Sequence, residues 1–409
     1  MRILHTSDWH LGRSLYDWKR YDEFEAFLEW LIKFMTHQQI ELLLLSGDVF
    51  DTTTPPNRAQ ELYYRFLSRI HETGCRHAVV IGGNHDSPTF LDAPKNLLGA
   101  LNIYVVGAAT ENPKDEIFVL RDVDGAPEAI VCAVPFLRDR DIRTVEAGES
   151  PDEKSRKLML GIENHYAMIA ALAEELQDHR QRVPVIGMGH LFTRHARTVE
   201  GDGVRELYIG SIAHVDGNSI SKGFDYMALG HLHMAQTAGN SEIIRYPGSP
   251  IPMGFAEAGQ TKKVVIVEFK QLLPVITEHP VPCFRNLISV SGDIETASRE
   301  IEGLIARKTE AWVEIDITSP ALATDITAHF DGLTENTKLE ILRIKNRNIA
   351  NLAITPVSEN ETLDSLDDSE VFSRCLDASG ISDPDERRQL ENTYSEARLS
   401  MVNSDSNAD

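Results

Sequence analysis

Apolar residues in the first part of the chain recur with two alternating periods. Short apolar runs at Ile3–Ser7 and Leu42–Leu45 are typical of buried strands, whereas apolar residues spaced three or four positions apart predict helices over 24–35 and 59–70. Further strands are predicted at 78–81, 129–134, 183–188, 226–229 and 264–269, with another helix near 163–176. Because helix and strand alternate at first and strands dominate later, we expect an α/β fold of two packed sheets with helices outside.

The pattern resets after Pro280-Val281-Pro282. Apolar segments between 287 and 344 then follow the order β-α-β-α-β, and two short amphipathic helices are predicted near 371–376 and 390–401. We therefore predict a first α/β domain at 1–280, a small α/β domain at 281–350, a linker at 351–368, a C-terminal helical element at 369–402 and a disordered tail at 403–409.

The composition is that of an ordinary globular protein, with 42% hydrophobic and 25% charged residues. The sequence contains no apolar run long enough to cross a bilayer, and its N-terminus lacks the pattern of a signal peptide. The four cysteines are scattered without a CxxC pair, which argues against a zinc knuckle or a disulfide framework. We therefore expect a cytoplasmic protein.

The formal net charge of −23 is unevenly distributed along the chain. Residues 356–409 hold 14 acidic and 4 basic residues, a net of −10, which leaves −13 for the other 355 residues. The sequence shows no basic stripe of the kind that autonomous nucleic-acid binding requires. A chain of this kind that acts on DNA therefore needs a partner to supply much of the binding.

Short polar motifs follow the predicted strands at five places. They are Asp8-Trp9-His10, Gly47-Asp48-Val49-Phe50-Asp51, Gly83-Asn84-His85-Asp86, Gly189-His190 and Gly230-His231-Leu232-His233. Four of them place glycine directly before the polar residue, and we expect glycine there to permit a sharp exit from the strand. Since open α/β sheets bind ligands beyond the carboxyl ends of their strands, the motifs are predicted to meet at one edge.

The donor types in these motifs indicate a metal site. Carboxylate, imidazole and amide oxygen form a mixed oxygen and nitrogen set that suits manganese, iron or zinc better than calcium. Two such cations close together can activate water and neutralise charge on a phosphoryl group. Taken singly, each motif has an ordinary alternative, such as a turn beside a core histidine or an Asx turn at Asn84. Their joint occurrence favours metal binding by Asp8, His10, Asp48, Asn84, His190, His231 and His233.

In this order the five motifs resemble those of the calcineurin-like metallophosphoesterase superfamily. The opening Arg-Ile-Leu-His-Thr-Ser-Asp-Trp-His-Leu-Gly, with Gly-Asp-Val-Phe-Asp-Thr and Tyr-Pro-Gly-Ser-Pro at 246–250, more narrowly resembles bacterial nuclease subunits that act with an SMC-like ATPase. That resemblance covers almost the whole chain. It implies a metallophosphoesterase sandwich, a capping domain at 281–350, and C-terminal helices that bind the ATPase.

The resemblance also implies roles for the motif residues. Asp8, His10 and His233 would hold one metal ion, and Asn84, His190 and His231 would hold the other. Asp48 would bridge the two ions, with manganese the expected metal and magnesium or another divalent cation as the alternative. His85 would be catalytic, either stabilising the transition state or protonating the leaving sugar oxygen. Some relatives carry histidine at the position of Asp51, so we expect this carboxylate to orient a neighbouring ligand rather than to contact DNA.

The implied function is that of a manganese-dependent nuclease subunit. Such a protein is a double-strand exonuclease and a single-strand or hairpin endonuclease in DNA recombination, replication and repair. The sequence contains no GxxxxGK[ST] motif, so an ATP-dependent activity needs a separate ATPase polypeptide. The resemblance further implies a homodimer within a heterotetramer, formed through the helix at 59–70. Basic residues of the capping domain are candidates for DNA contact, namely Lys338, Arg343, Lys345 and Arg347.

Two other functions remain as alternatives. The same metal site serves phosphatases or phosphodiesterases of small molecules and phosphoproteins, although the capping domain and C-terminal helices are superfluous for such enzymes. A binding scaffold with a vestigial metal site is the other alternative. The intact set of seven ligands, together with His85, argues against it.

Overall fold

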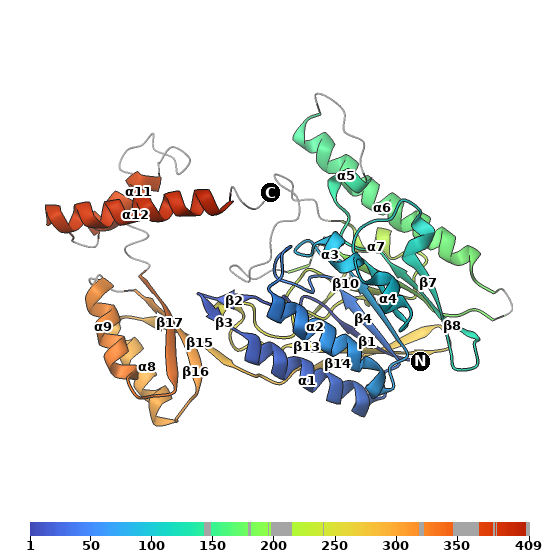
Figure 1. The fold of residues 1–409 in the computed structure, drawn as a ribbon, viewed down its shortest axis with the longest axis horizontal. Coiled ribbons are helices and arrows are strands. Elements are labelled where there is room, and N and C mark those ends of the chain that lie inside the picture. The colour runs from blue at the N-terminus through green and yellow to red at the C-terminus, as the bar shows by residue number, and fades with distance from the viewer. Residues whose placement is uncertain are drawn as a thin grey trace. The chain divides into compact units, whose positions relative to one another are not determined.

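The computed structural model describes residues 1–142, 149–178, 181–194, 196–197, 215–239, 241–318, 323–346, 368–378, 381 and 383–405 (Figure 1). Contacts divide the chain into two units, Met1–Phe284 and Arg285–Asp409. The predicted linker at 351–368, except Asp368, lies outside the described residues, as do Arg347 and the last four residues of the predicted tail.

The first unit contains two six-stranded sheets. One has the order β14-β13-β1-β4-β5-β6, in which β1 (Arg2–Thr6), β4 (Leu42–Ser46), β5 (His77–Ile81) and β6 (Ile103–Val106) are parallel. Two antiparallel strands, β13 (Lys263–Lys270) and β14 (Leu273–Pro280), complete it. The other sheet has the order β11-β12-β10-β9-β8-β7. Its strands are β7 (Ile117–Arg121), β8 (Pro127–Ala133), β9 (Val185–His190), β10 (Tyr226–Gly230), β11 (Gln236–Ala238) and β12 (Ser241–Tyr246).

Alternating residues of the strands face two different cores, which explains why the strands are apolar throughout. Leu42 and Leu44 of β4 pack toward the second sheet, in the core that also contains Ile186 of β9. Leu43 and Leu45 of the same strand face outward and pack with the apolar sides of α1 (Tyr21–Gln38) and α2 (Asn57–Arg69). On the opposite side, α6 (Pro151–Glu175) covers the second sheet. The predicted fold class of two packed sheets with outer helices is confirmed.

The remaining elements of the first unit are short. They are β2 (Ser14–Leu15), β3 (Trp18–Lys19), α3 (Pro88–Asp92), α4 (Lys95–Gly99), α5 (Asp139–Ile142), α7 (Gly217–Ile220) and the 3-10 turns η1 (Ile70–Thr73), η2 (Pro113–Glu116) and η3 (Phe255–Glu257). The predicted helix at 163–176 is longer than expected, because Ser150 and Glu153 form a capping box that begins α6 at Pro151. Within the described residues, no helix is both long and apolar enough to span a membrane.

The second unit begins with a three-stranded parallel sheet in the order β15-β16-β17. The elements β15 (Asn286–Gly292), α8 (Ile294–Ala306), β16 (Ala311–Ile317), α9 (Ala323–Thr334) and β17 (Leu339–Asn346) reproduce the predicted β-α-β-α-β order. Each parallel neighbour is reached through a crossover helix, and Val313, Ile301 and Phe330 lie in the shared core.

Two helices follow in the second unit, α11 (Asp368–Ala378) and α12 (Pro384–Asp405). The rings of Phe372 and Tyr394 stack with centroids 4.1 Å apart. Arg387 of α12 donates hydrogen bonds to Asp377 and to Ser373 of α11. The helices thus form a pair, and α12 includes residues 403–405 that were predicted to belong to the tail.

Candidate metal centre

The predicted ligands follow the carboxyl ends of five strands from both sheets. Asp8 and His10 follow β1, Asp48 follows β4, and Asn84 follows β5. His190 ends β9, and the segment after β10 supplies the remaining two histidines, His231 and His233. Because β1, β4 and β5 are parallel to one another, as are β9 and β10, these ends lie at one edge of each sheet.

Several of these residues have unusual backbone angles. Asp8, His10 and Asp48 have φ values of 53°, 46° and 49°, and His231 has 103°, although none of them is glycine. Such angles are unfavourable for residues with a side chain and persist only where surrounding contacts impose them. Here Asp8 N–H donates to the carbonyl of Gly47 at 3.0 Å, and His231 N–H donates to Asp8 Oδ1 at 3.0 Å. The loops therefore hold one another in place.

The glycines of the motifs are required mainly for close approach. A Cβ on Gly83 would lie 2.1 Å from Asp48 Oδ1, and one on Gly230 would lie 1.8 Å from the carbonyl oxygen of Ser46. Among the four motif glycines, Gly47 alone has a positive φ, of 84°. The expectation that glycine serves to permit a sharp turn is therefore correct at Gly47 and wrong at the other three.

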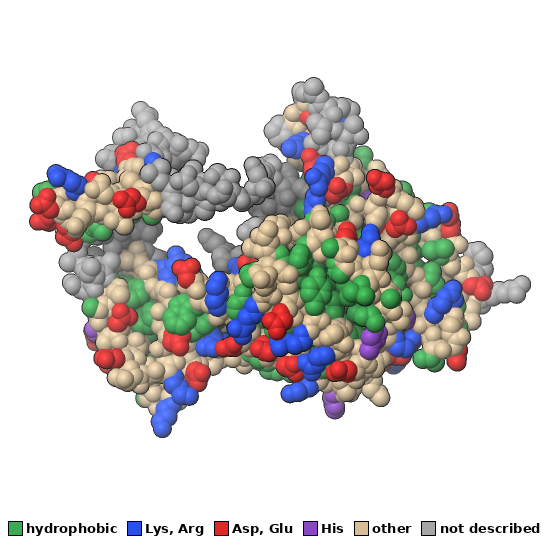
Figure 2. Space-filling model, in the orientation of Figure 1, with side chains coloured by type: hydrophobic (Ala, Val, Ile, Leu, Met, Phe, Trp, Pro, Cys, Tyr) green, Lys and Arg blue, Asp and Glu red, His purple; other side chains and the backbone are tan. Residues whose placement is uncertain are grey.

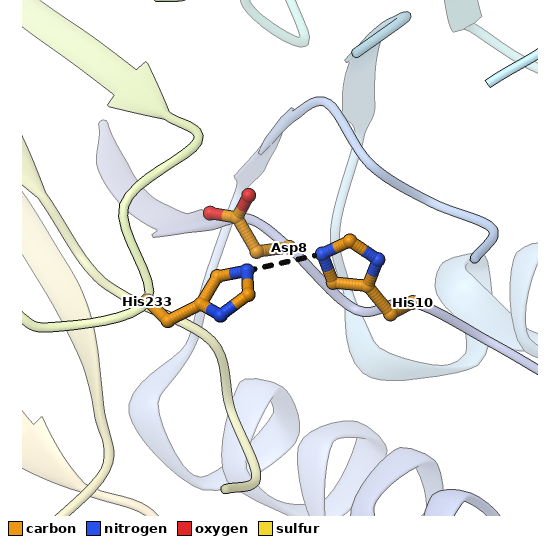
Figure 3. Close-up of side chains that lie close together, drawn as sticks. All are labelled: Asp8, His10 and His233. Carbon is orange, nitrogen blue, oxygen red and sulfur yellow. Dashed lines mark hydrogen bonds between the residues drawn. The ribbon is translucent and has the colours of Figure 1, made fainter. Parts of the chain in front are cut away.

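Asp8, His10 and His233 form the first group of donors (Figure 3). One ligand atom from each lies within 4.8 Å of the others, and all three residues are buried. His10 Nε2 and His233 Nε2 are 3.2 Å apart, as the dashed line in Figure 3 marks. Two ring nitrogens and a carboxylate thus converge on one point.

The second group contains Asp48, His190 and His231, whose ligand atoms also lie within 4.8 Å of one another. Asn84 joins it, with Oδ1 at 3.0 Å from His190 Nε2. Asp48 Oδ2 lies 3.4 Å from His190 Nε2 and 3.6 Å from His10 Nε2. The Asp48 carboxylate is therefore located between the two groups.

The outer ring nitrogens show which atoms are available to a metal. His190 Nδ1 donates to the carbonyl of Ser46 at 2.9 Å. His10 Nδ1 lies 3.3 Å from Asp51 Oδ1, and His233 Nδ1 lies 3.2 Å from Glu257 Oε1. Since these oxygens only accept hydrogen bonds, a neutral ring at each position would carry its proton on Nδ1, which would leave the Nε2 lone pair free to bind a metal at the centre.

His85 lies beside the first group. Its Nδ1 donates to the carbonyl of Asp51 at 2.7 Å, and its backbone N–H donates to Asp48 Oδ1 at 2.9 Å. The rings of His85 and His10 meet edge to face, with centroids 4.8 Å apart. All eight residues predicted for the site are thus brought together, and Asp51 lies beside His10.

Comparisons with known proteins agree with this arrangement. The calcineurin-like phosphoesterase family model matches residues 1–235, and the model described as Type 5 capsule protein repressor C-terminal domain, SbcD_C, matches 283–379. The D subunit of the nuclease SbcCD from Escherichia coli (strain K12) is 36% identical over 391 residues, covering 95% of this chain and 96% of that protein. The chain belongs to the SbcD family of calcineurin-like phosphoesterases.

Other relatives extend the comparison. The corresponding protein of the nuclease SbcCD from Bacillus subtilis (strain 168) is 34% identical over 272 residues, 66% of each chain. A crystal structure of a dimetal phosphatase from Danio rerio is a distant structural relative, which covers 69% of this chain and 97% of its own at 11% identity and a TM-score of 0.39. The resemblance to nuclease subunits inferred from the motifs is confirmed by the SbcD relatives.

The charges at the SbcD-family site conflict with one another. Burial lowers the pKa of His10 to about 4 and raises that of Asp8 to about 6. Burial also raises the pKa of Asp48, but the neighbouring His190 outweighs it and holds that pKa well below its ordinary value. Burial lowers the pKa of His190, whereas the Asp48 carboxylate raises it to about 9. Divalent cations would resolve the conflict by accepting these lone pairs, so the donor set fits a metal centre.

The sequence did not identify two sets of supporting residues. Asp86 accepts hydrogen bonds from the backbone N–H groups of Gly83, Val49 and Phe50, at 2.9 to 3.1 Å, and so joins the loops after β4 and β5. Its place in the third motif was a signal, although an Asx turn at Asn84 was the ordinary alternative for that motif. Glu257, with its partner Lys262, carried no comparable signal, because both follow the motifs in a segment without a recognisable pattern.

Proposed function

We propose that this chain is a DNA nuclease that uses two divalent metal ions, with manganese as the expected metal. Asp8, His10 and His233 would hold one ion and Asn84, His190 and His231 the other. The observation that carries the proposal is the position of Asp48, whose Oδ2 lies between His10 Nε2 and His190 Nε2 at 3.6 and 3.4 Å. A carboxylate between two sets of donors is suited to bridging two cations.

The residues of the site have distinct tasks in phosphodiester hydrolysis. Two bound cations would activate water and neutralise the charge that develops on the phosphoryl group. His85 donates Nδ1–H to the carbonyl of Asp51, so Nε2 is the ring nitrogen left for catalysis. As an imidazolium, the ring would stabilise the charge of the transition state or pass its Nε2 proton to the leaving sugar oxygen. The Asp51 carboxylate also lies near His10 Nδ1 and forms an ion pair with Arg13. Asp51 would thus position His10 through its side chain and His85 through its backbone carbonyl.

DNA is the proposed substrate because the relatives that match nearly the whole chain are named nucleases. We assign both a double-strand exonuclease and a single-strand or hairpin endonuclease activity, in recombination, replication and repair. The basic residues of the capping domain contribute little net charge, since Lys345 Nζ lies 2.9 Å from Glu314 and Lys338 Nζ lies 3.0 Å from Glu310. A partner protein therefore supplies much of the attraction for DNA.

The proposed partner is an SbcC-like ATPase of the SMC family. The relatives are named as one subunit of a nuclease called SbcCD, which implies a companion protein. The pair of helices α11 and α12 is suited to docking, because Phe372 and Tyr394 stack and Arg387 bonds to Asp377, so the pair is held by its own contacts. An amphipathic helical element of this kind is a common recognition unit for another protein.

We also propose that two copies of the chain associate within a heterotetramer. The stripe of α2 predicted as a dimer face is buried in the chain's own core, including Tyr63 and Phe66. The neighbouring surface is nevertheless apolar: Leu97 in α4 is 71% exposed and Leu101 is 42% exposed. Figure 2 shows hydrophobic side chains gathered over α2, α3 and α4. This face is suited to association with a second copy.

The experiment incubates the purified chain, with and without the ATPase and ATP, with hairpin DNA and Mn²⁺. We expect the wild type to cleave the hairpin, and His85→Ala to lower the rate by about 100- to 10,000-fold while Mn²⁺ still binds. His37→Ala, a change at an exposed histidine of α1, is the matched control and should cleave normally. An inactive wild type in both conditions, or normal cleavage by His85→Ala, would overturn the assignment.

Native mass measurement tests the partner interaction separately. Deleting residues 360–409 should abolish binding of the ATPase while leaving the metal site intact. An unchanged complex would show that α11 and α12 are not the docking element.

A further inference from the structure

The segment Tyr246-Pro-Gly-Ser-Pro250 packs against the main chain of His233, one of the predicted metal ligands. A Cβ on Gly248 would lie 2.6 Å from the carbonyl oxygen of His233 and 2.8 Å from the backbone nitrogen of Ala235, and Gly248 has a φ of 80°. Ser249 N–H donates to the same carbonyl at 3.2 Å. The segment therefore supports the loop after β10 through its main chain.

A buried ion pair follows this segment. Lys262 is 6% exposed, and its Nζ donates to the carbonyl of His233 at 3.0 Å, to Ser249 Oγ at 3.0 Å and to Glu257 Oε2. Glu257 is 1% exposed, and its other oxygen, Oε1, lies 3.2 Å from His233 Nδ1. Its Oε2 also accepts from the backbone N–H of Met253 at 3.1 Å. One charge pair thus contacts both the main chain and the ring of His233.

The location of this pair requires an explanation beyond stability. Burying two charges is costly, and well-packed apolar residues often serve equally well in the same space. A carboxylate on the outer nitrogen of a metal-binding histidine fixes the tautomer and the ring orientation and makes the ring a stronger ligand. In the second group, His190 Nδ1 instead donates to a neutral acceptor, the carbonyl of Ser46. The two groups are therefore supported differently.

We propose that Glu257 is a positioning residue for His233, and that Lys262 holds its carboxylate in place. The inference rests on the proposed function, because it takes the group of Asp8, His10 and His233 to hold a metal ion. Loss of Glu257 is then expected to weaken binding of the ion in that group, while the ion held by the group of His190 and His231 is retained.

The test measures Mn²⁺ binding to the full chain by isothermal titration calorimetry. The wild type should bind two ions, and Glu257→Leu should weaken one of them by about 10- to 100-fold while the other is unchanged. Glu257→Gln keeps an oxygen that accepts the proton of His233 Nδ1, so it should lose less affinity than Glu257→Leu. Glu242→Gln is the matched control, since the Glu242 side chain is 82% exposed on β12.

A second comparison separates positioning from general stability. Lys262→Met leaves the carboxylate of Glu257 buried without its cation, whereas Glu257→Gln/Lys262→Met removes both charges. Thermal melting in a chelator should therefore show the double variant to be more stable than Lys262→Met. If Glu257→Leu does not fold, the double variant serves for the binding measurement, and it should still bind one ion more weakly than the other.

The outcomes distinguish this inference from the proposed function. Binding of both ions with wild-type affinity in every Glu257 variant would overturn the positioning role. Equal weakening of both ions would also overturn it, because Glu257 would then support the fold rather than one ligand. A wild type that binds no Mn²⁺ would overturn the proposed function itself.

Discussion

The charged residues at the two ends of the central strands differ in their exposure to solvent. At the carboxyl ends of β1 and β4, Asp8 and Asp48 are 0% and 1% exposed and have positive φ values. At the amino end of β1, Arg2 forms an ion pair of 2.6 Å with Glu268, and their side chains are 35% and 42% exposed. Exposed pairs contribute little to stability, whereas buried charges require compensation. Of the residues compared, those with the costly arrangement are Asp8 and Asp48, at the carboxyl ends where the predicted ligands meet.

The largest expected effect is that of Asp48→Asn at the carboxyl end. An amide cannot supply the negative charge between the two groups, so we expect loss of DNA cleavage and weaker binding of both metal ions. Cleavage of hairpin DNA and calorimetry with Mn²⁺ measure these effects. Glu268→Gln, the same loss of a carboxylate charge at the amino end, should leave both unchanged. Normal cleavage by Asp48→Asn would show that the buried carboxylates at the carboxyl ends are not needed for activity.

Next in size is the effect of Asp86→Ala on stability. The change leaves three backbone N–H groups near the site without their acceptor, namely those of Gly83, Val49 and Phe50. Each buried N–H that loses its partner costs about 1–3 kcal/mol, so the free energy of unfolding should fall by roughly 3 kcal/mol or more. Urea denaturation in a chelator measures it, with the exposed Asp124→Ala as control. A fall no larger than that of the control contradicts the role given to Asp86.

Gly83→Ala is expected to have an intermediate effect. The added Cβ would lie 2.1 Å from Asp48 Oδ1 and 2.4 Å from Asp48 N, and overpacking of this kind costs about 1–3 kcal/mol. Gly303→Ala in α8 is the matched change, because its Cβ meets nothing within 4 Å and helical glycine is less favourable than alanine by about 0.5–1 kcal/mol. The two substitutions should therefore change the melting temperature in opposite directions. Shifts of the same sign would refute the steric explanation.

The smallest effect is expected at the amino end of the strands. Glu268→Ala removes the partner of Arg2, and because the pair is partly exposed the loss should be about 0–1 kcal/mol. Urea denaturation at low and high salt measures it, and the small difference should shrink further as salt screens the pair. A loss as large as that of Asp86→Ala would show that the two ends do not differ as described.

The sequence identified the donor residues that the structure brings together because each lies at or just after the end of an apolar strand. His190 and Asp48 are each preceded by glycine at the end of such a run. The sequence alone therefore shows both the place of these residues at a strand end and the type of donor atom that they offer. It also predicted most strands of the core, such as β1, β4 and β5, which are apolar on both faces because each face meets a different layer, but it did not predict β6. The edge strand β14 was missed, because its exposed positions include the apolar residues Leu273 and Val275, so the sequence does not alternate between apolar and polar residues.

Contacts between distant segments were not predictable in the same way. Glu257 and Lys262 contact His233 because the fold brings the loop after β12 against the loop after β10. Likewise, the closeness of Gly83 to Asp48 arises from the packing of two loops, so the sequence suggested the wrong reason for that glycine. Residue types at strand ends are local information, whereas their supports depend on the completed sheets.

The distribution of the ligands also determines when, during synthesis, the site can form. Each group of donors takes members from both sheets. Asp8 and His10 are synthesised long before His233, and Asp48 long before His190 and His231, so neither group is complete until its later histidines have been made. The first sheet itself is incomplete until β13 pairs with β1. A nascent chain still attached to the ribosome therefore lacks both donor groups through the first half of its translation. The order of the strands alone keeps the proposed nuclease inert until most of its first unit has been made.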